Sequence, residues 1–241
     1  MSNTTSPGAF AKALQERRRR QNRRKLFGII SGAGVLLVGA LVVWLLFFSS
    51  VFAVTDVRVT GNQLLATEEV VQVAGVQTGL PLLTTDIDAV GSRVAGLVPV
   101  EGVTVERSFP GTIAIEVTER TLVYQRLDGA QYQWVDRHGV VFNTASTPEA
   151  GALVAETATA EPRLLADVAT VATFLPEELL PRVQLVTAAA VDQIEIGLTD
   201  GDVVVWGSAE QSELKAEVLT ALLSVEAEVY DVSAPGYPTT K

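Results

Sequence analysis

The sequence predicts an α+β protein that crosses a membrane once and carries two folded domains after the crossing. Residues 26–48 contain no charged side chain over twenty-three positions. Between residues 54 and 117, three segments alternate apolar and polar residues, as half-buried strands do, and two others place apolar residues on one helical face. Alternating strand patterns and one-sided helix patterns occur again between residues 121 and 236. The predicted domains are a β-α-α-β-β unit over residues 49–120 and a mixed α/β unit with a mainly antiparallel sheet over residues 121–236, followed by a short tail, residues 237–241.

The uncharged run over residues 26–48 is predicted to be a transmembrane helix. It reads LFGIISGAGVLLVGALVVWLLFF, in which Ser31 is the one hydroxyl side chain. As a helix it would be about 35 Å long, enough to cross a hydrocarbon core of about 30 Å with some tilt. A helix of this length in a soluble domain would show a polar face.

The charged residues predict the orientation of this helix. Residues 1–25 carry eight Lys and Arg against one acid, Glu16, whereas residues 49–241 sum to a net charge of about −17. The positive-inside rule therefore places residues 1–25 in the cytoplasm as a basic tail and the acidic part outside, in a single-pass plasma-membrane protein. The predicted topology signal consists of Arg17, Arg18, Arg19, Arg20, Arg23, Arg24 and Lys25. Nucleic-acid binding is the weaker interpretation, since no aromatic residues interleave these arginines.

A cleaved signal peptide is an alternative interpretation of the N-terminal region. Val51 and Ala53 stand where a signal peptidase needs small residues, and Arg23-Arg24 precede Lys25 and Leu26 in a twin-arginine context. The apolar region of a cleaved signal is about 7–15 residues long, and the run here is longer. An uncleaved anchor is the favoured interpretation.

Within residues 49–120 the patterns predict three strands and two helices. The first strand, Val54 to Thr60, ends at Gly61-Asn62. The predicted helices cover residues 68–74 and a segment that starts after Asp86 as N-cap and carries Ile87, Val90, Val94 and Leu97 on one face. The other predicted strands cover residues 103–107 and 113–117, joined by a turn at residues 109–111.

The segment after residue 121 is predicted to add a second α/β unit. Predicted strands cover residues 122–127, 131–136, 140–142, 183–188, 194–198, 203–206 and 229–233. Asp128-Gly129 and Asp200-Gly201 favour tight hairpin turns. Residues 144–162, rich in Ala, Thr and Glu, are predicted to form an exposed loop. One helix is predicted from Arg163 until Pro176 ends it, and a second opens at residues 208–211 and continues to Val225.

Several of these segments together resemble the FtsQ/DivIB family of cell division proteins. The first part of the resemblance is Phe52-Ala53-Val54 with Val57, Val59, Gly61 and Asn62, then Asp86, then Val105-Glu106-Arg107-Ser108-Phe109-Pro110-Gly111-Thr112-Ile113 running into Val117-Thr118-Glu119-Arg120. The second part is Tyr132-Gln133-Trp134-Val135-Asp136-Arg137-His138-Gly139-Val140-Val141-Phe142, together with Lys215 and the ending Asp231-Val232 with Pro235. The resemblance implies a POTRA domain over residues 49–120 and an FtsQ-type β domain over residues 121–236.

The sequence offers no catalytic, cofactor-binding or metal-binding set of residues. There is no cysteine and a single histidine, His138, so neither a zinc site nor a Cys-His or Ser-His relay can form within one chain. The carboxylate pairs Asp86/Asp88 and Asp200/Asp202 occur at a helix start and at a turn, where such residues are common. Trp134 and Trp206 are interpreted as core or sheet-face residues. The prediction is a protein that is not an enzyme and acts by binding.

The family resemblance implies a partner-binding edge at the end of the second domain. An edge strand leaves backbone N–H and C=O groups with which a partner strand can pair. The implied contact residues are Val229, Tyr230, Asp231, Val232, Ser233, Gly236, Tyr237, Pro238, Thr239 and Thr240. The alternative is that Val229 to Val232 is only the last core strand. Pro235 and Pro238 limit the pairing surface because proline has no N–H. Proline at Val232 or Thr239 is expected to weaken partner capture.

The resemblance further implies a division scaffold that binds FtsB/DivIC-type and FtsL-type single-span proteins outside the membrane and, through them, acts on a septal peptidoglycan synthase of the FtsW/FtsI type. The expected location is the plasma membrane at the division septum. Two alternatives belong to other classes: a membrane-tethered cell-envelope hydrolase or ligand-binding domain, and a POTRA-type secretion chaperone. No cofactor is expected.

Overall fold

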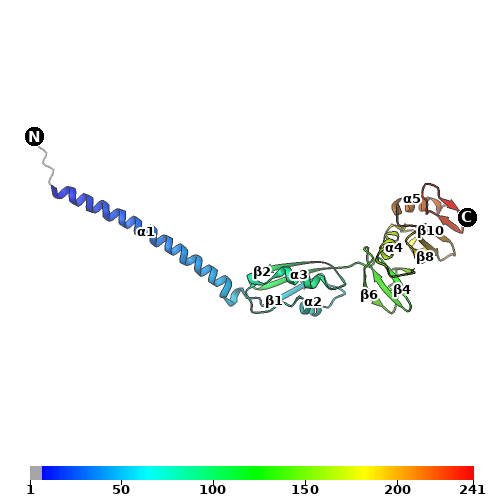
Figure 1. Cartoon of the computed structure of the whole chain (residues 1–241), viewed down its shortest axis with the longest axis horizontal. Coiled ribbons are helices and arrows are strands. Elements are labelled where there is room, and N and C mark those ends of the chain that lie inside the picture. The colour runs from blue at the N-terminus through cyan, green and yellow to red at the C-terminus, as the bar shows by residue number, and fades with distance from the viewer. Residues whose placement is uncertain (1–6) are drawn as a thin grey trace, which may run out of the picture. The chain divides into compact units, whose positions relative to one another are not determined.

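The computed structural model describes residues 7–241, with side chains from residue 28 onward, and begins with one long helix, α1 (Pro7–Phe48), of 42 residues (Figure 1). Its segment Gly28–Phe48 has a mean hydropathy of 2.5, is not buried, and is the single helix among the described residues that is long and apolar enough to span a membrane. The helix begins at Pro7 and continues through the basic stretch. The side chains of the predicted topology signal lie outside those described, so that signal stays a prediction.

The segment after α1 has the predicted β-α-α-β-β order. Its elements are η1 (Ser50–Phe52), β1 (Asp56–Thr60), α2 (Thr67–Ala74), η2 (Leu82–Thr84), α3 (Ile87–Ala95), β2 (Val100–Ser108) and β3 (Thr112–Glu119). The three strands form a sheet in the order β1-β3-β2. Alternate residues of β3 are buried, with Ile113 and Ile115 inaccessible to solvent, which is the period-2 pattern of a sheet that covers a core on one face.

Several side chains of this segment stabilise its loops and a helix start by hydrogen bonds to backbone N–H and C=O groups. Asp86 caps α3, since its carboxylate accepts a hydrogen bond from the Ala89 N–H at 3.0 Å. Glu119 accepts from the N–H groups of three consecutive residues, Gln63, Leu64 and Leu65. Arg107 donates to the carbonyl oxygens of Leu82 and Thr85. Arg107 and Glu119, both part of the motif that resembled a family, therefore have structural roles here.

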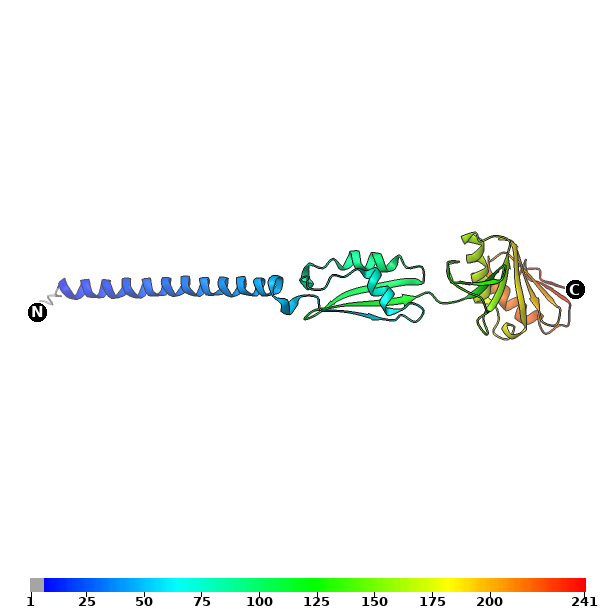
Figure 2. The same ribbon diagram turned by 90° about the horizontal axis from the view of Figure 1, so that it is seen from below.

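The second segment is built on a sheet of nine strands in the order β12-β11-β10-β9-β8-β7-β4-β5-β6 (Figure 2). The strands are β4 (Tyr124–Asp128), β5 (Gln131–Val135), β6 (Val141–Ala145), β7 (Leu153–Thr157), β8 (Val183–Ala190), β9 (Gln193–Leu198), β10 (Val203–Gly207), β11 (Val229–Asp231) and β12 (Thr239–Thr240). The helical elements are α4 (Pro162–Phe174), η3 (Leu180–Arg182) and α5 (Ser212–Leu222). Both α helices share one buried core with the sheet. The sheet is mixed and mainly antiparallel, as predicted.

The prediction of an exposed loop over residues 144–162 is wrong. Residues Leu153–Thr157 form β7, which pairs in parallel with β4 on one side and β8 on the other. Ala155, in its middle, is completely buried. This strand joins the β4-β5-β6 meander to the rest of the sheet, so the domain has one continuous sheet.

The turn between β5 and β6 depends on Asp136 and Gly139, two residues of the sequence motif over residues 132–142. The Asp136 carboxylate accepts hydrogen bonds from the N–H groups of His138 and Val140, at 2.9 and 2.8 Å. Burial raises the pKa of Asp136, but hydrogen bonds from the Val140 backbone, from Arg120 and from the His138 backbone outweigh it and hold the pKa below its usual value. Gly139 has a positive φ of 75° and lies against the first turn of α4.

Replacing Gly139 with alanine should destabilise the second domain by about 2 kcal/mol or more, because a left-handed φ and steric overlap both oppose a Cβ atom. That atom would lie 2.5 Å from the Ala166 nitrogen and 2.7 Å from the Pro162 oxygen. Gly129→Ala is the matched control, since Gly129 also has a positive φ, of 62°, but open space around it. Thermal unfolding of the two full-length variants should show the larger decrease in Tm for Gly139→Ala. Equal decreases would mean that the contact with α4 contributes nothing.

Candidate protein-interaction edge

Three strands, β10, β11 and β12, form one end of the nine-stranded sheet, and five of the ten predicted site residues lie in β11 and β12. β11 pairs in parallel with β10, Val203 opposite Val229 and Val205 opposite Asp231. β12 then folds back and pairs antiparallel with β11, Tyr230 opposite Thr240 and Asp231 opposite Thr239. The sequence analysis placed the open edge on residues 229–233, whereas in the structure β12 lies along that edge.

The predicted site residues divide into core and surface side chains. Tyr230 is 3% exposed and Val232 is fully buried, so their side chains belong to the domain core. Val229 and Asp231 are half-buried. The exposed ones are Ser233, Gly236, Tyr237, Pro238, Thr239 and Thr240. Tyr237 is the most exposed large hydrophobic residue of the described side chains, at 88%. Partner contact through these residues stays a prediction. Only the exposed ones could contact a partner with their side chains.

The backbone geometry shows that Val232 is a poor position for testing partner capture. Its N–H donates to the Val205 carbonyl of β10 at 3.0 Å, so proline there would break the pairing inside the sheet. Val229 faces the other way: its N–H donates to the Lys241 carbonyl at 3.0 Å, and its carbonyl accepts from the Lys241 N–H at 3.0 Å. A change at Val229 therefore acts on the side of β11 that faces β12.

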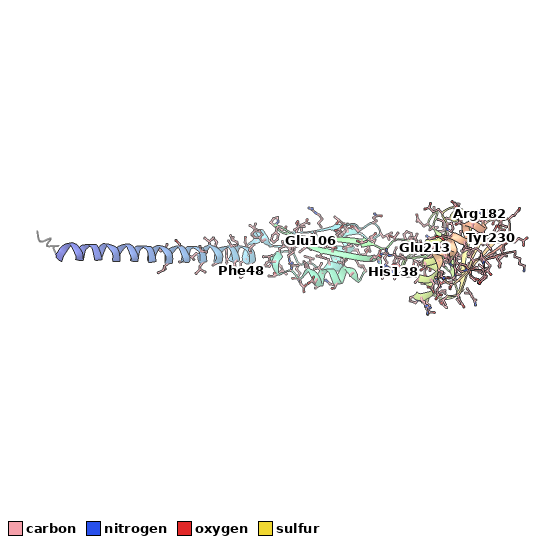
Figure 3. All side chains as sticks on the ribbon, turned by 90° about the horizontal axis from the view of Figure 1, so that it is seen from above. Phe48, Glu106, His138, Arg182, Glu213 and Tyr230 are labelled. Atoms are coloured by element: carbon pink, nitrogen blue, oxygen red, sulfur yellow. The ribbon has the colours of Figure 1, made fainter. Side chains whose placement is uncertain are left out.

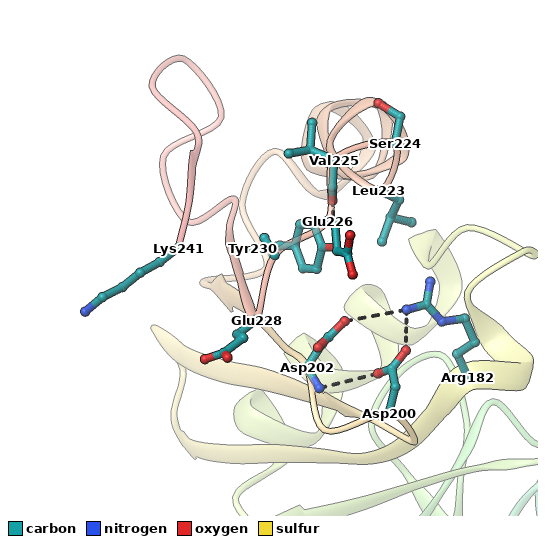
Figure 4. Close-up of a pocket in the computed structure, with 11 residues that line it drawn as sticks. Arg182, Asp200, Asp202, Leu223, Ser224, Val225, Glu226, Glu228, Tyr230 and Lys241 are labelled. Carbon is teal, nitrogen blue, oxygen red and sulfur yellow. Dashed lines mark hydrogen bonds and ion pairs between the residues drawn. The ribbon is translucent and has the colours of Figure 1, made fainter.

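A cavity of about 750 Å³ lies beside this edge (Figure 4). Its lining residues come from η3, the β9-β10 turn, the segment after α5, β11 and the position after β12: Arg182, Asp200, Asp202, Leu223, Ser224, Val225, Glu226, Ala227, Glu228, Tyr230 and Lys241. Four of them are carboxylates and two are cationic. The Tyr230 hydroxyl donates to the Val225 carbonyl at 2.9 Å, which fixes the segment after α5 against β11.

Arg182 and the turn aspartates form an ion pair at the rim of this cavity. The Arg182 guanidinium donates to Asp200 and lies 3.7 Å from the Asp202 carboxylate. This hydrogen bond lowers the pKa of Asp200 and raises the pKa of Arg182. The sequence analysis explained the Asp200/Asp202 pair by turn formation alone and missed Arg182, because no local pattern shows that residues 182 and 200 meet.

A buried lysine holds the end of β10. Lys215, on α5, is 1% exposed, and its ammonium donates to the carbonyl oxygens of Trp206 and Ser208 at 2.9 and 2.8 Å. Burial lowers the pKa of Lys215, against the opposing effect of Glu210 and Asp231. The Trp206 indole N–H donates to Ser212 at 3.2 Å. These bonds satisfy backbone groups where β10 ends, so Lys215 has a structural role.

The described side chains also give little support for a metal-binding or catalytic site elsewhere in the domain. No group of three or more His, Asp or Glu within them could hold a metal ion. His138 is exposed in the β5-β6 turn, and in Figure 3 it lies at the opposite end of the second domain from Arg182 and Tyr230. The edge and its cavity are therefore the candidate site, with backbone pairing as its mode of recognition.

Comparison with known proteins decides the family. Residues 52–120 match the family model for a POTRA domain of the FtsQ type, and residues 123–233 match that for the C-terminal part of the cell division protein FtsQ/DivIB. The chain is 37% identical over 234 residues to the cell division protein FtsQ of Streptomyces bingchenggensis, covering 92% of this chain and 88% of that protein. The chain belongs to the FtsQ/DivIB family. A second FtsQ, from Mycolicibacterium smegmatis, is 34% identical over 252 residues, 96% of this chain and 75% of that protein.

Membership of the FtsQ/DivIB family confirms several expectations. The chain is a homologue of a cell division protein, its two folded segments are a POTRA domain and an FtsQ-type C-terminal domain, and the family is not enzymatic. Among solved structures, the extracytoplasmic domain of the division protein DivIB from Geobacillus stearothermophilus matches 44% of this chain and 93% of that domain, at 15% identity and a TM-score of 0.36. At that score the likeness adds nothing to the family assignment.

Replacing Lys215 with methionine should lower the free energy of unfolding by about 1–3 kcal/mol, because the carbonyl groups of Trp206 and Ser208 would stay buried without a donor. Glu217→Met on the exposed face of the same helix is the control, expected within about 0.5 kcal/mol of the unmodified protein. Thermal or denaturant unfolding of the full-length chain measures both. If the two variants lose equal stability, the buried hydrogen bonds of Lys215 have no net stabilising effect.

Proposed function

We propose that this protein is a single-pass scaffold of the bacterial division complex, with residues 1–25 in the cytoplasm and both domains outside the membrane at the septum. The apolar helix Gly28–Phe48 supports membrane anchoring. The charge difference between residues 1–25 and residues 49–241 supports the orientation. Family membership supports a role in cell division.

The scaffold works by capturing extended segments of an FtsB/DivIC-type and an FtsL-type partner at the sheet end formed by β11 and β12. The observation that supports this most is the backbone of that end: the sheet stops at β12, a short, exposed strand with no neighbour among the described residues on its outer side. Backbone pairing supplies affinity without a catalytic group. The captured partners in turn act on a septal peptidoglycan synthase of the FtsW/FtsI type.

Replacing Val229 with proline should weaken partner capture about tenfold or more, since the change removes the N–H that donates to the Lys241 carbonyl and holds the end of β12 against β11. Val229→Ala is the matched control, because it keeps the N–H group. Each full-length variant would be produced with the FtsB/DivIC-type and FtsL-type proteins of the same organism, and the amounts that co-purify would be compared.

Fluorescent fusions on the cytoplasmic N-terminus test the cellular side of the proposal. The unmodified protein should form a band at midcell that disappears with the division ring. Uniform membrane fluorescence throughout the cell cycle, together with equal co-purification by both Val229 variants, would contradict the proposal and favour the envelope-binding or secretion alternatives.

A further inference from the structure

We infer that the end of the POTRA domain next to the membrane helix docks on the lipid surface and inserts exposed apolar side chains into its interfacial layer. The docking surface, here called the membrane-proximal rim, consists of residues 49–55, 76–85 and 108–115. Its occupant is the headgroup and upper acyl region of the bilayer that α1 spans. The inference rests on the proposed function in one respect, the anchoring of the chain in a membrane by α1.

Backbone hydrogen bonds join the three segments of the rim into one structure. The Val54 N–H donates to the Leu80 carbonyl at 2.8 Å, which ties the first segment to the second. The Thr55 N–H donates to the Gly111 carbonyl, also at 2.8 Å, which ties the first segment to the third. Segments far apart in the sequence are therefore held together directly after the membrane helix.

The rim lies close to the end of the membrane helix. α1 ends at Phe48, and Ala53 already forms an isolated β-bridge with Pro81 inside the rim. Five residues reach at most about 17 Å when fully extended. Here the connection is shorter, because η1 is a 3₁₀ turn within it, and the end of α1 lies against both η1 and η2. The headgroup layer on each side of a bilayer is about 5–8 Å thick. The rim is therefore within reach of that layer.

The rim exposes large apolar side chains from all three of its segments. Val51 is 63% exposed, Leu80 47% and Phe109 56%. The rings of Phe52 and Phe109 meet edge to face with their centroids 6.2 Å apart, so two segments present one aromatic surface. Phe48, the last residue of α1, is exposed as well. Exposed apolar patches mark contacts with membranes or other proteins, and continuity with a membrane helix favours the membrane here.

The charge distribution also favours a lipid surface. No residue of the rim has a charged side chain, although residues 49–241 sum to a net charge of about −17. Acidic residues begin directly where two of the segments end, with Asp56 at the start of β1 and Asp86 as the cap of α3. Anionic headgroups repel an acidic surface, and a charged side chain is costly to bring toward hydrocarbon. The rim is thus an uncharged part of an acidic chain, next to the bilayer.

Spin labels in a bilayer that contains this chain alone test the docking. The chain has no cysteine, so each introduced cysteine carries the only label. Thr78→Cys and Ser108→Cys place labels on exposed rim residues and keep every apolar side chain of the rim. Gly39→Cys reports on the insertion of α1, and Thr118→Cys, exposed near the other end of β3, is the control in water.

Each full-length variant would be placed in nanodiscs of phosphatidylcholine and phosphatidylglycerol. Collisions of the label with oxygen, which concentrates in lipid, would be compared with collisions with a water-soluble nickel chelate. The ratio of oxygen to nickel collisions should be at least about threefold higher for the two rim labels than for the Thr118→Cys label.

A charged substitution tests whether the apolar side chains hold the rim in the lipid. Phe109→Asp, added to Thr78→Cys, should raise nickel collisions at the label by about threefold or more, because a carboxylate is costly to bury in the interface. Val98→Asp is the matched control and should change nothing. Val98 is also 56% exposed, but it precedes β2, whereas Phe109 follows that strand.

The outcomes separate this inference from the proposed anchoring. Rim labels in water, together with a Gly39→Cys label in lipid, would overturn the inference and leave the anchoring intact, even if another protein later shielded the rim. Equal effects of Phe109→Asp and Val98→Asp would also overturn the inference. A Gly39→Cys label in water would overturn both.

Discussion

The parallel pairing of β10 with β11 is the contact on which the last strands of the domain depend. Parallel neighbours need a crossover connection, and here that connection is α5, whose buried face shares the domain core. Lys215 on α5 donates to the carbonyl groups at the end of β10, so the helix and the strand it covers are fixed together. The position of β11, and with it the edge that β12 covers, follows from this unit.

Sequence patterns predicted the parts of the structure that depend on interactions between residues close together in the chain. The uncharged run predicted the membrane helix, and Asp200-Gly201 between two apolar strands predicted the β9-β10 hairpin, in which Gly201 has a positive φ of 98°. Asp86 was predicted as the cap of α3 and does accept the Ala89 N–H. In each case the residues that carry the signal lie within one element or one turn of one another.

The features that the sequence did not predict depend on contacts between distant residues. β7 lies in an Ala, Thr and Glu-rich stretch with a weak strand pattern, and it is a strand because β4 and β8 pair with it on both sides. β12 has two threonines after a proline, and β11 supplies its pairing. Arg182 and Asp200 meet through the packing of η3 beside the β9-β10 turn. The sequence therefore predicted a strand over residues 229–233 at the end of the domain, but neither the pairing of β12 along it nor the cavity beside it.

Hydrogen–deuterium exchange at single amides would test most directly the account of this sheet end as a partner-binding site. The full-length chain in nanodiscs would be compared with and without its FtsB/DivIC-type and FtsL-type partners. The account predicts that partners slow exchange at this end of the sheet, above all at Thr240, whose N–H points away from β11. Unchanged exchange at every amide of residues 229–241, with new protection elsewhere in the chain, would contradict it, since the partners would then bind another surface.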